Sequence, residues 1–242
     1  MVTETERTVR DRLYYRVGSV AAVGGVTAAL VQTAIDPGVS DNPQEAIRRA
    51  AGSHMLASSR LLDMVAFLLL IVGVAAVTGT FAQTSARGWA RAGLAMFTVS
   101  AGAGAIATMI VGSLNDVAST WSDAPAGLKP AYVAIFDSMS KISGGISAVA
   151  WAALAAYGLL YAQAMLLEGT FPRWLSWISR GSAIATLGAL GVGSGFQLDF
   201  AFVLLVVGIV LSYVVIVAFG VRLWRPSRRC GLHDVRRPAW PC

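Results

Sequence analysis

The chain has 242 residues, of which 56% are hydrophobic and 13% charged, and its mean hydropathy is +0.64. Soluble domains carry roughly a quarter charged residues, so this composition excludes an ordinary water-soluble protein. The length suffices for one helical bundle, without a second folded soluble domain. The net charge of +6 does not indicate nucleic-acid binding, because the basic residues lie outside the apolar runs.

Six apolar segments are each long enough to cross a hydrocarbon core about 30 Å thick, which takes roughly 20 helical residues. They span residues 17–35, 61–81, 92–112, 130–167, 174–195 and 198–224. In lipid every backbone amide needs an internal partner, so each segment is expected to be a helix. The second helix is expected to begin earlier, near Ala51, and Gly144-Gly145 is a possible kink in the fourth. We therefore predict an all-α polytopic transmembrane bundle of about six helices.

The basic residues predict how this bundle is oriented. Six crossings place both termini on one side, and that side collects most of the 19 basic residues: Arg7, Arg10, Arg12, Arg16, Arg87, Arg91, Arg173, Arg180, Arg222, Arg225, Arg228, Arg229, Arg236 and Arg237. Because positive residues stay in the cytoplasm, both termini are expected there, in a multi-pass protein of the plasma membrane. The chain then divides into a cytoplasmic segment (1–16), the bundle (17–224) and a basic tail (225–242) that is expected to be disordered.

Metal and cofactor signals are absent from the sequence. Cys230 and Cys242 both lie in the tail, and no Cys-x-x-Cys motif or Cys/His cluster occurs. No D-D-x-x-D motif for binding a diphosphate through magnesium occurs either. We expect no metal and no cofactor.

Polar residues gather near the predicted outer ends of the helices, and we expect them at one level. The set comprises Asp36, His54, Arg60, Asp63, Asn115, Asp116, Asp137, Lys141, Gln197 and Asp199. Arg60 and Asp63 are three residues apart, and Asp137 and Lys141 are four apart, so each pair can touch on a helix face. These groups either cap helices and meet lipid headgroups, or form a functional site, which is the usual meaning of an ionisable residue inside a membrane.

Three short motifs resemble a large bacterial family of multi-pass membrane proteins known as a domain of unknown function. They are the segment from Arg60 to Phe67, the Phe136-Asp137-Ser138 segment, and the segment from Phe171 to Leu175 before the fifth helix. The resemblance covers roughly residues 12–222. It implies a six-helix bundle and no particular activity.

The arrangement of acids is similar to that of small membrane-bound terpene cyclases of meroterpenoid and indole-terpenoid pathways. Those enzymes carry one acid in the second helix and another in the last, where Asp63 and Asp199 lie here. They are usually described with seven crossings, whereas this sequence predicts six. The resemblance implies cyclisation of an isoprenoid chain started by protonation.

The first functional hypothesis is therefore a membrane-embedded enzyme that acts on a lipid-soluble substrate, with the bilayer and that substrate as its partners. Desolvation raises the pKa of a carboxyl group, which such an acid needs. Asp63 is the predicted acid, with Asp199 or Asp137 as its partner or the final base; an Arg60–Asp63 ion pair would oppose this role. The predicted substrate-binding residues, including aromatic rings that stabilise a carbocation, are Arg60, Lys141, His54, Phe136, Trp151, Phe196 and Phe200.

Two alternatives remain open from the sequence. A small proton-coupled transporter would use the paired charges as a relay, although no internal repeat is visible between the two halves. A non-catalytic membrane subunit or lipid-binding sensor fits the Ala- and Gly-rich helices equally well.

Overall fold

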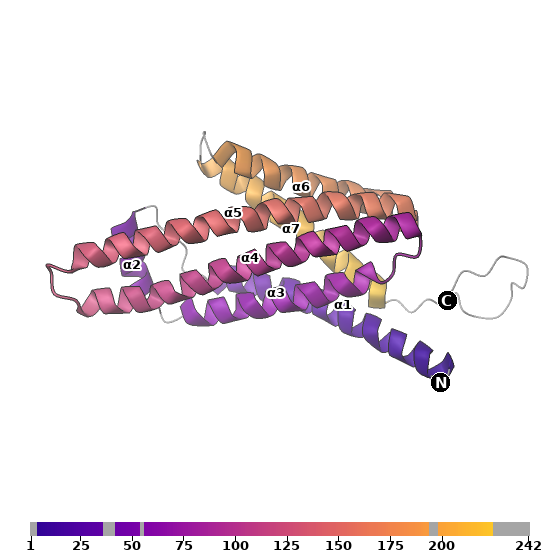
Figure 1. Ribbon diagram of the computed structural model, residues 1–242, viewed down its shortest axis with the longest axis horizontal. Coiled ribbons are helices and arrows are strands. Elements are labelled where there is room, and N and C mark those ends of the chain that lie inside the picture. Colours follow the sequence, from indigo (N-terminus) through magenta and orange to yellow (C-terminus); the bar gives the residue numbers. More distant parts are fainter. Residues whose placement is uncertain (1–3, 36–41, 54–55, 194–197, 225–242) are drawn as a thin grey trace, which may run out of the picture.

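The computed structural model describes residues 4–35, 42–53, 56–193 and 198–224, and within these ranges the regular structure is entirely helical. The helices are α1 (Glu4–Ile35), α2 (Pro43–Ala51), α3 (Leu56–Thr78), α4 (Thr84–Asp123), α5 (Lys129–Glu168), α6 (Arg173–Gly193) and α7 (Leu198–Trp224). α1 begins and α7 ends at the same end of the bundle, which we name the terminal end; the opposite end, near α2, is the distal end (Figure 1).

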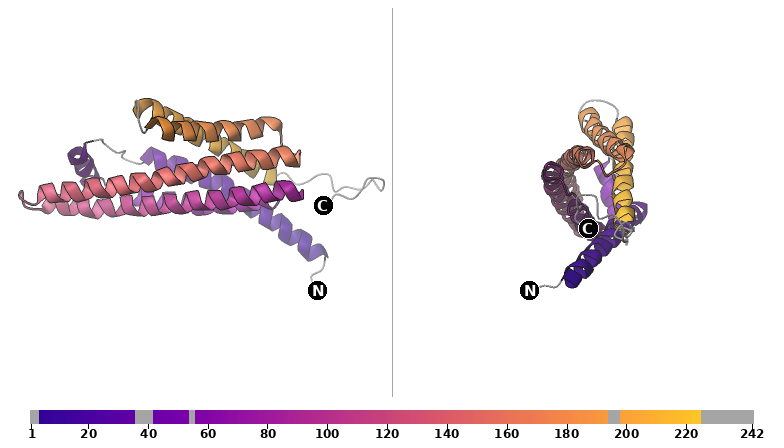
Figure 2. Two further views of the ribbon diagram at one scale, coloured as in Figure 1. Left: turned by 45° about the horizontal axis from the view of Figure 1, so that its top comes forward. Right: turned by 90° about the vertical axis from the view of Figure 1, so that its right-hand side faces the viewer.

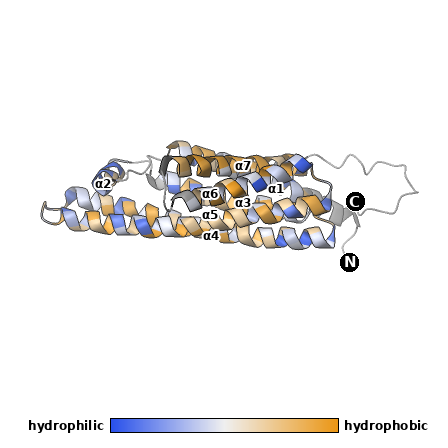
Figure 3. Cartoon of the chain, turned by 90° about the horizontal axis from the view of Figure 1, so that it is seen from above, coloured by the Kyte–Doolittle hydropathy of each residue, from blue (hydrophilic) through white to orange (hydrophobic). Residues whose placement is uncertain are grey.

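Five of these helices, α1, α3, α4, α5 and α7, are long and apolar enough to cross a membrane, so the chain is a multi-pass membrane protein. Apolar residues dominate along the middle of the bundle, and hydrophilic residues are more frequent toward its two ends (Figure 3). α6 is not among the five. Arg173 and Arg180 and several Ser and Gly residues reduce its apolar character, and it packs between α5 and α7.

The six long helices of the described chain form a closed ring. Contacts join α1 to α3, α3 to α4, α4 to α5, α5 to α6, α6 to α7, and α7 back to α1. The view along the bundle shows α6 on the side away from the start of α1, with α7 running from α6 toward α1 (Figure 2). Each of these helices therefore packs against a neighbour on either side in the ring; α3 also contacts α7, and α4 and α5 also contact α2.

Small residues set the close spacing of these helices. A Cβ added to Gly73 of α3 would lie 2.7 Å from the Cα of Ala22 on α1, so only glycine permits this approach. On the other side of α1, Ser19 Oγ donates to the carbonyl of Gly220 on α7 at 2.6 Å. Interhelical contacts of this kind replace the hydrophobic effect, which does not drive association between helices in lipid.

α4 and α5 form an antiparallel hairpin of 40 residues per helix, about 60 Å long. Ser100 Oγ donates to the carbonyl of Ala150 at 2.8 Å, and seven residues further along Ser143 Oγ donates to the carbonyl of Ala107 at 3.2 Å, so the register is constant. A hydrocarbon core takes roughly 20 residues of helix. The hairpin therefore extends well beyond the predicted span of residues 92–112.

α2 packs against the distal part of this hairpin. Asn42 caps α2 by accepting a hydrogen bond from the backbone of Gln44 at 3.0 Å, and Pro43 occupies the first turn. Its apolar face lies in a cluster with α4 and α5 that comprises Ala46, Ile47, Ala50, Leu114, Ala118 and Phe136. The prediction that the second long helix begins near Ala51 is wrong, because α2 is a separate helix that ends there and α3 begins at Leu56.

The terminal half of the bundle contains a continuous aromatic core. It comprises Phe81, Phe97, Tyr157, Tyr161, Phe171 and Phe219, whose neighbouring ring centroids lie 4.8–5.9 Å apart. Buried aromatic pairs at these spacings add stability beyond their buried area. At this end of the bundle α1 begins at Glu4, within the segment predicted to be cytoplasmic. The predicted tail, residues 225–242, lies outside the described residues.

Candidate functional site

Asp63 on α3 forms an interhelical hydrogen bond inside the bundle. The hydroxyl of Thr108 on α4 donates to Asp63 Oδ2 at 2.7 Å; Thr108 is buried, and Asp63 is half-buried. Thr108 lies four residues before Gly112, where the uncharged apolar run of α4 ends. Asp63 is therefore an ionisable group beside an apolar stretch of helix, with a hydroxyl partner.

A third helix interacts with this acid at longer range. Tyr213 of α7, which is half-buried, has an electrostatic interaction with Asp63. The Asp63 carboxyl group is therefore bonded across α3 and α4, and α7 adds an electrostatic interaction. Sequence reasoning missed both Thr108 and Tyr213, although Ser212-Tyr213 is a visible polar interruption of the last apolar segment.

The predicted contact between Asp137 and Lys141 is confirmed. Lys141 Nζ lies 2.6 Å from Asp137 Oδ2, and the two side chains are 76% and 33% exposed, respectively. The expectation that all the polar groups lie at one level is wrong. In the register of the hairpin Asp137 is opposite Ser113, beyond the apolar run, whereas Asp63 is bonded to Thr108 within it.

The other predicted site residues fall in several places. Arg60 is half-buried on α3, one turn before Asp63, and Trp151 is half-buried on α5. Phe136 is enclosed in the cluster under α2, and Phe200 is 53% exposed on α7. His54, Phe196 and the side chain of Asp199 lie outside the described residues, although the backbone of Asp199 belongs to the first turn of α7.

Glu168 at the terminal end is a buried acid that sequence reasoning did not single out. Its Oε1 and Oε2 accept hydrogen bonds from the backbone N–H groups of Ala82 and Gln83, each at 3.2 Å, just before α4 begins. A carboxylate is stabilised at a helix N-terminus by the exposed N–H groups and the helix dipole. Glu168 therefore fixes the α3–α4 turn to the end of α5, and it is a structural group.

A second set of polar contacts secures the same turn. Arg87 donates from Nε to the carbonyl of Phe81 at 3.0 Å and from a terminal guanidinium nitrogen to the carbonyl of Ala82 at 3.1 Å. On the neighbouring connection between α5 and α6, the Arg222 guanidinium of α7 lies over the ring of Phe171, 4.4 Å from its centroid. Sequence signals for these roles were weak, since each residue reads equally well as a charge at the membrane surface.

Metal ligands do not cluster in the described ranges: no three His, Cys, Asp or Glu residues there come close enough to hold an ion. Comparison with known proteins adds no family, since no protein-family model, no curated protein and no solved structure matches the chain. The Asp63–Thr108–Tyr213 site is therefore the arrangement from which a function must be argued.

Proposed function

We propose that the chain crosses the plasma membrane six times with both termini in the cytoplasm, and that it is an enzyme acting on a lipid-soluble substrate with Asp63 as its acid. The sixth crossing is α6, whose packing between α5 and α7 supports it. The excess of basic residues at the terminal end supports the orientation. The distal end then faces outward.

The observation that carries the enzymatic proposal is the hydrogen bond from the buried Thr108 hydroxyl to Asp63 Oδ2 beside an apolar stretch of helix. This bond orients the carboxyl group that is proposed to donate the proton. An acid in such a place costs stability, and a group kept despite that cost is a candidate functional group.

In its most specific form the proposal is cyclisation of a linear isoprenoid chain. A carbon–carbon double bond of the substrate takes the proton from the Asp63 carboxyl group, leaving a carboxylate and a carbocation. A second double bond attacks the cation and closes the ring, and loss of a proton to a carboxylate yields an isomer and restores the acid. Of the predicted cation-stabilising rings, Phe136 packs in the cluster under α2 and Phe200 is exposed, so support for this form comes from the acid alone.

The experiment measures the rate at which the purified protein, in detergent or liposomes, converts a linear polyprenyl substrate. Asp63→Asn removes the proton donor and is expected to lower the rate by 10²-fold or more, the scale of general acid catalysis. Thr108→Val keeps the acid and removes its orientation, so a smaller loss is expected. Asp116→Asn, an exposed acid on the distal part of α4, is the matched control and leaves the rate unchanged.

A non-catalytic subunit or sensor is the second candidate, supported by the α2 cluster on the distal part of the hairpin, which offers a folded surface beyond the apolar run of α4. It requires a fixed partner that co-purifies with the chain and an Asp63→Asn variant that behaves as the parent does. Turnover that persists in Asp63→Asn would also reject Asp63 as the acid. A transporter is less well supported, because the aromatic core fills the terminal half of the bundle.

A further inference from the structure

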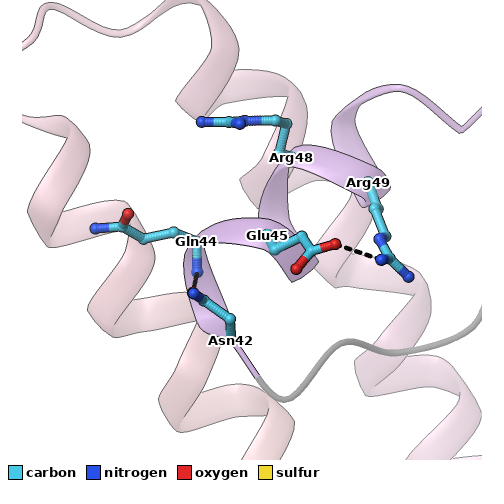
Figure 4. Close-up of a pocket in the computed structure, with 5 residues that line it drawn as sticks. All are labelled: Asn42, Gln44, Glu45, Arg48 and Arg49. Atoms are coloured by element: carbon cyan, nitrogen blue, oxygen red, sulfur yellow. Dashed lines mark hydrogen bonds and ion pairs between the residues drawn. The ribbon is translucent and has the colours of Figure 1, made fainter.

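The outward face of α2 carries two arginines, and their surroundings differ. Arg49 is paired with Glu45 one turn earlier on the helix. Arg48 is exposed and forms no ion pair within the described part of the chain. Gln44 and Arg48, also one turn apart, project to one side of α2, and the Glu45–Arg49 pair lies on the other (Figure 4).

The depth of α2 follows from its packing on the hairpin. Its buried residues contact Leu114 and Ala118 of α4, which lie two and six residues beyond Gly112. At 1.5 Å per residue this is about 3 to 9 Å outside the hydrocarbon boundary. A headgroup layer extends roughly 5–8 Å on each side of the hydrocarbon core. α2 therefore lies at the depth of the headgroups, where phosphate groups are the abundant anions.

The side chains around Arg48 form a shallow hollow with suitable donors. It is lined by Asn42, Gln44, Glu45, Arg48 and Arg49. A guanidinium group matches a phosphate with two parallel N–H donors, and the Gln44 amide on the same side can supply another. Glu45 does not cancel this charge, because its carboxylate is engaged by Arg49.

We infer that Arg48, assisted by Gln44, binds the phosphate of a phospholipid in the leaflet at the distal end. The ligand class is an anionic phospholipid such as phosphatidylglycerol, whose phosphate lies at the depth of α2 while its acyl chains lie along the bundle. This site is separate from Asp63 and does not depend on the proposed enzymatic function. It makes α2 a lipid-anchored helix that holds the distal hairpin at the membrane surface.

The first test measures phosphatidylglycerol retained per protein by native mass spectrometry after titration of the lipid into detergent. Arg48→Gln is expected to weaken retention about fivefold, which corresponds to about 1 kcal/mol for one basic residue near the surface. Lys129→Gln is the matched control. Lys129 lies over Trp121 at the tip of the hairpin, about 10 Å beyond Leu114, and its loss leaves retention unchanged. Equal retention by Arg48→Gln and the parent protein would overturn the inference.

Two further measurements test whether the bound phosphate belongs to a lipid or to a free anion, and at what depth α2 lies. Inorganic phosphate at millimolar concentration is expected not to displace the lipid; displacement would identify a site for a free anion instead. A spin label at Gln44→Cys, with Cys230 and Cys242 replaced by Ser, is expected at phosphate depth in phosphatidylglycerol liposomes. A label at Ala126→Cys on the hairpin tip reports bulk water, and the same signal from Gln44→Cys would place α2 outside the headgroups and contradict the inference.

Discussion

The two ends of α5 are packed very differently. Between Lys129 and Val149 only Phe136 and Ser143 are buried, and both face α4. Between Ala150 and Glu168 ten residues are buried, because that half of α5 lies between α4 and α6 and contributes two tyrosines to the aromatic core. The terminal half of the bundle therefore has the density of a structural core, and the distal half has a partner on one side.

The contacts that stabilise the fold and the acid proposed for catalysis lie in different halves of the bundle. The terminal half contains the aromatic core, the buried Glu168 and the secured α3–α4 turn. The distal half contains Asp63 and its hydrogen bond to Thr108. Binding and catalytic groups are commonly placed on the less tightly packed parts of a rigid scaffold. Substitutions in the two halves are therefore expected to affect different properties.

The largest expected effect on folding is at the tightest helix crossing. Gly73→Ala places a Cβ 2.7 Å from the backbone of Ala22, so α1 and α3 must separate. We expect a loss of about 3 kcal/mol in the free energy of unfolding, measured by SDS titration in mixed micelles. Gly145→Ala on the distal half of α5 meets no atom within 4 Å and is expected to be neutral or stabilising by up to about 1 kcal/mol. Equal losses in both variants would contradict the comparison.

A smaller effect is expected from the acids of the two halves. Glu168→Gln removes the charge that accepts hydrogen bonds from two backbone N–H groups, and should cost about 2 kcal/mol in the same titration. Asp137→Asn breaks an exposed pair with Lys141 on the distal hairpin and should cost less than about 0.5 kcal/mol. A larger loss from Asp137→Asn than from Glu168→Gln would show that the distal hairpin, and not the terminal end, stabilises the fold.

Much of this architecture could be predicted because length and hydropathy are local properties of a segment. The apolar runs identified the long helices, and Asp63 was found because a charged residue within an apolar run is rare. The span predicted for α5, residues 130–167, nearly matches the helix, but the distal extension of α4 beyond residue 112 was missed, since Ser113 and Asp116 look like the residues of a loop at the surface. This extension packs against α2 through Leu114 and Ala118.

The partners within the site could not be predicted, because they depend on register between helices. Thr108 contacts Asp63 only through the relative position of α3 and α4, which no periodicity within either helix determines. Glu168 was passed over for a related reason: in sequence it precedes Gly169 at the end of an apolar run, as a surface charge would. Its burial arises because the α3–α4 turn folds over it.

Within the terminal half, two neighbouring tyrosines of the aromatic core are expected to respond to loss of the hydroxyl with opposite signs, each by less than Glu168→Gln. The hydroxyl of Tyr161 is bonded to Thr78 and donates to the carbonyl of Val74 at 3.2 Å, so Tyr161→Phe should cost about 0.6–1.7 kcal/mol, the range for hydrogen bonds between membrane helices. The hydroxyl of Tyr157 is buried and has no hydrogen-bond partner in the described chain. Tyr157→Phe should therefore stabilise the fold by about 1 kcal/mol, since it removes an unsatisfied polar group. If Tyr157→Phe destabilised the protein as Tyr161→Phe does, a polar partner would be required inside the terminal half. That half would then contain a binding site as well as a core.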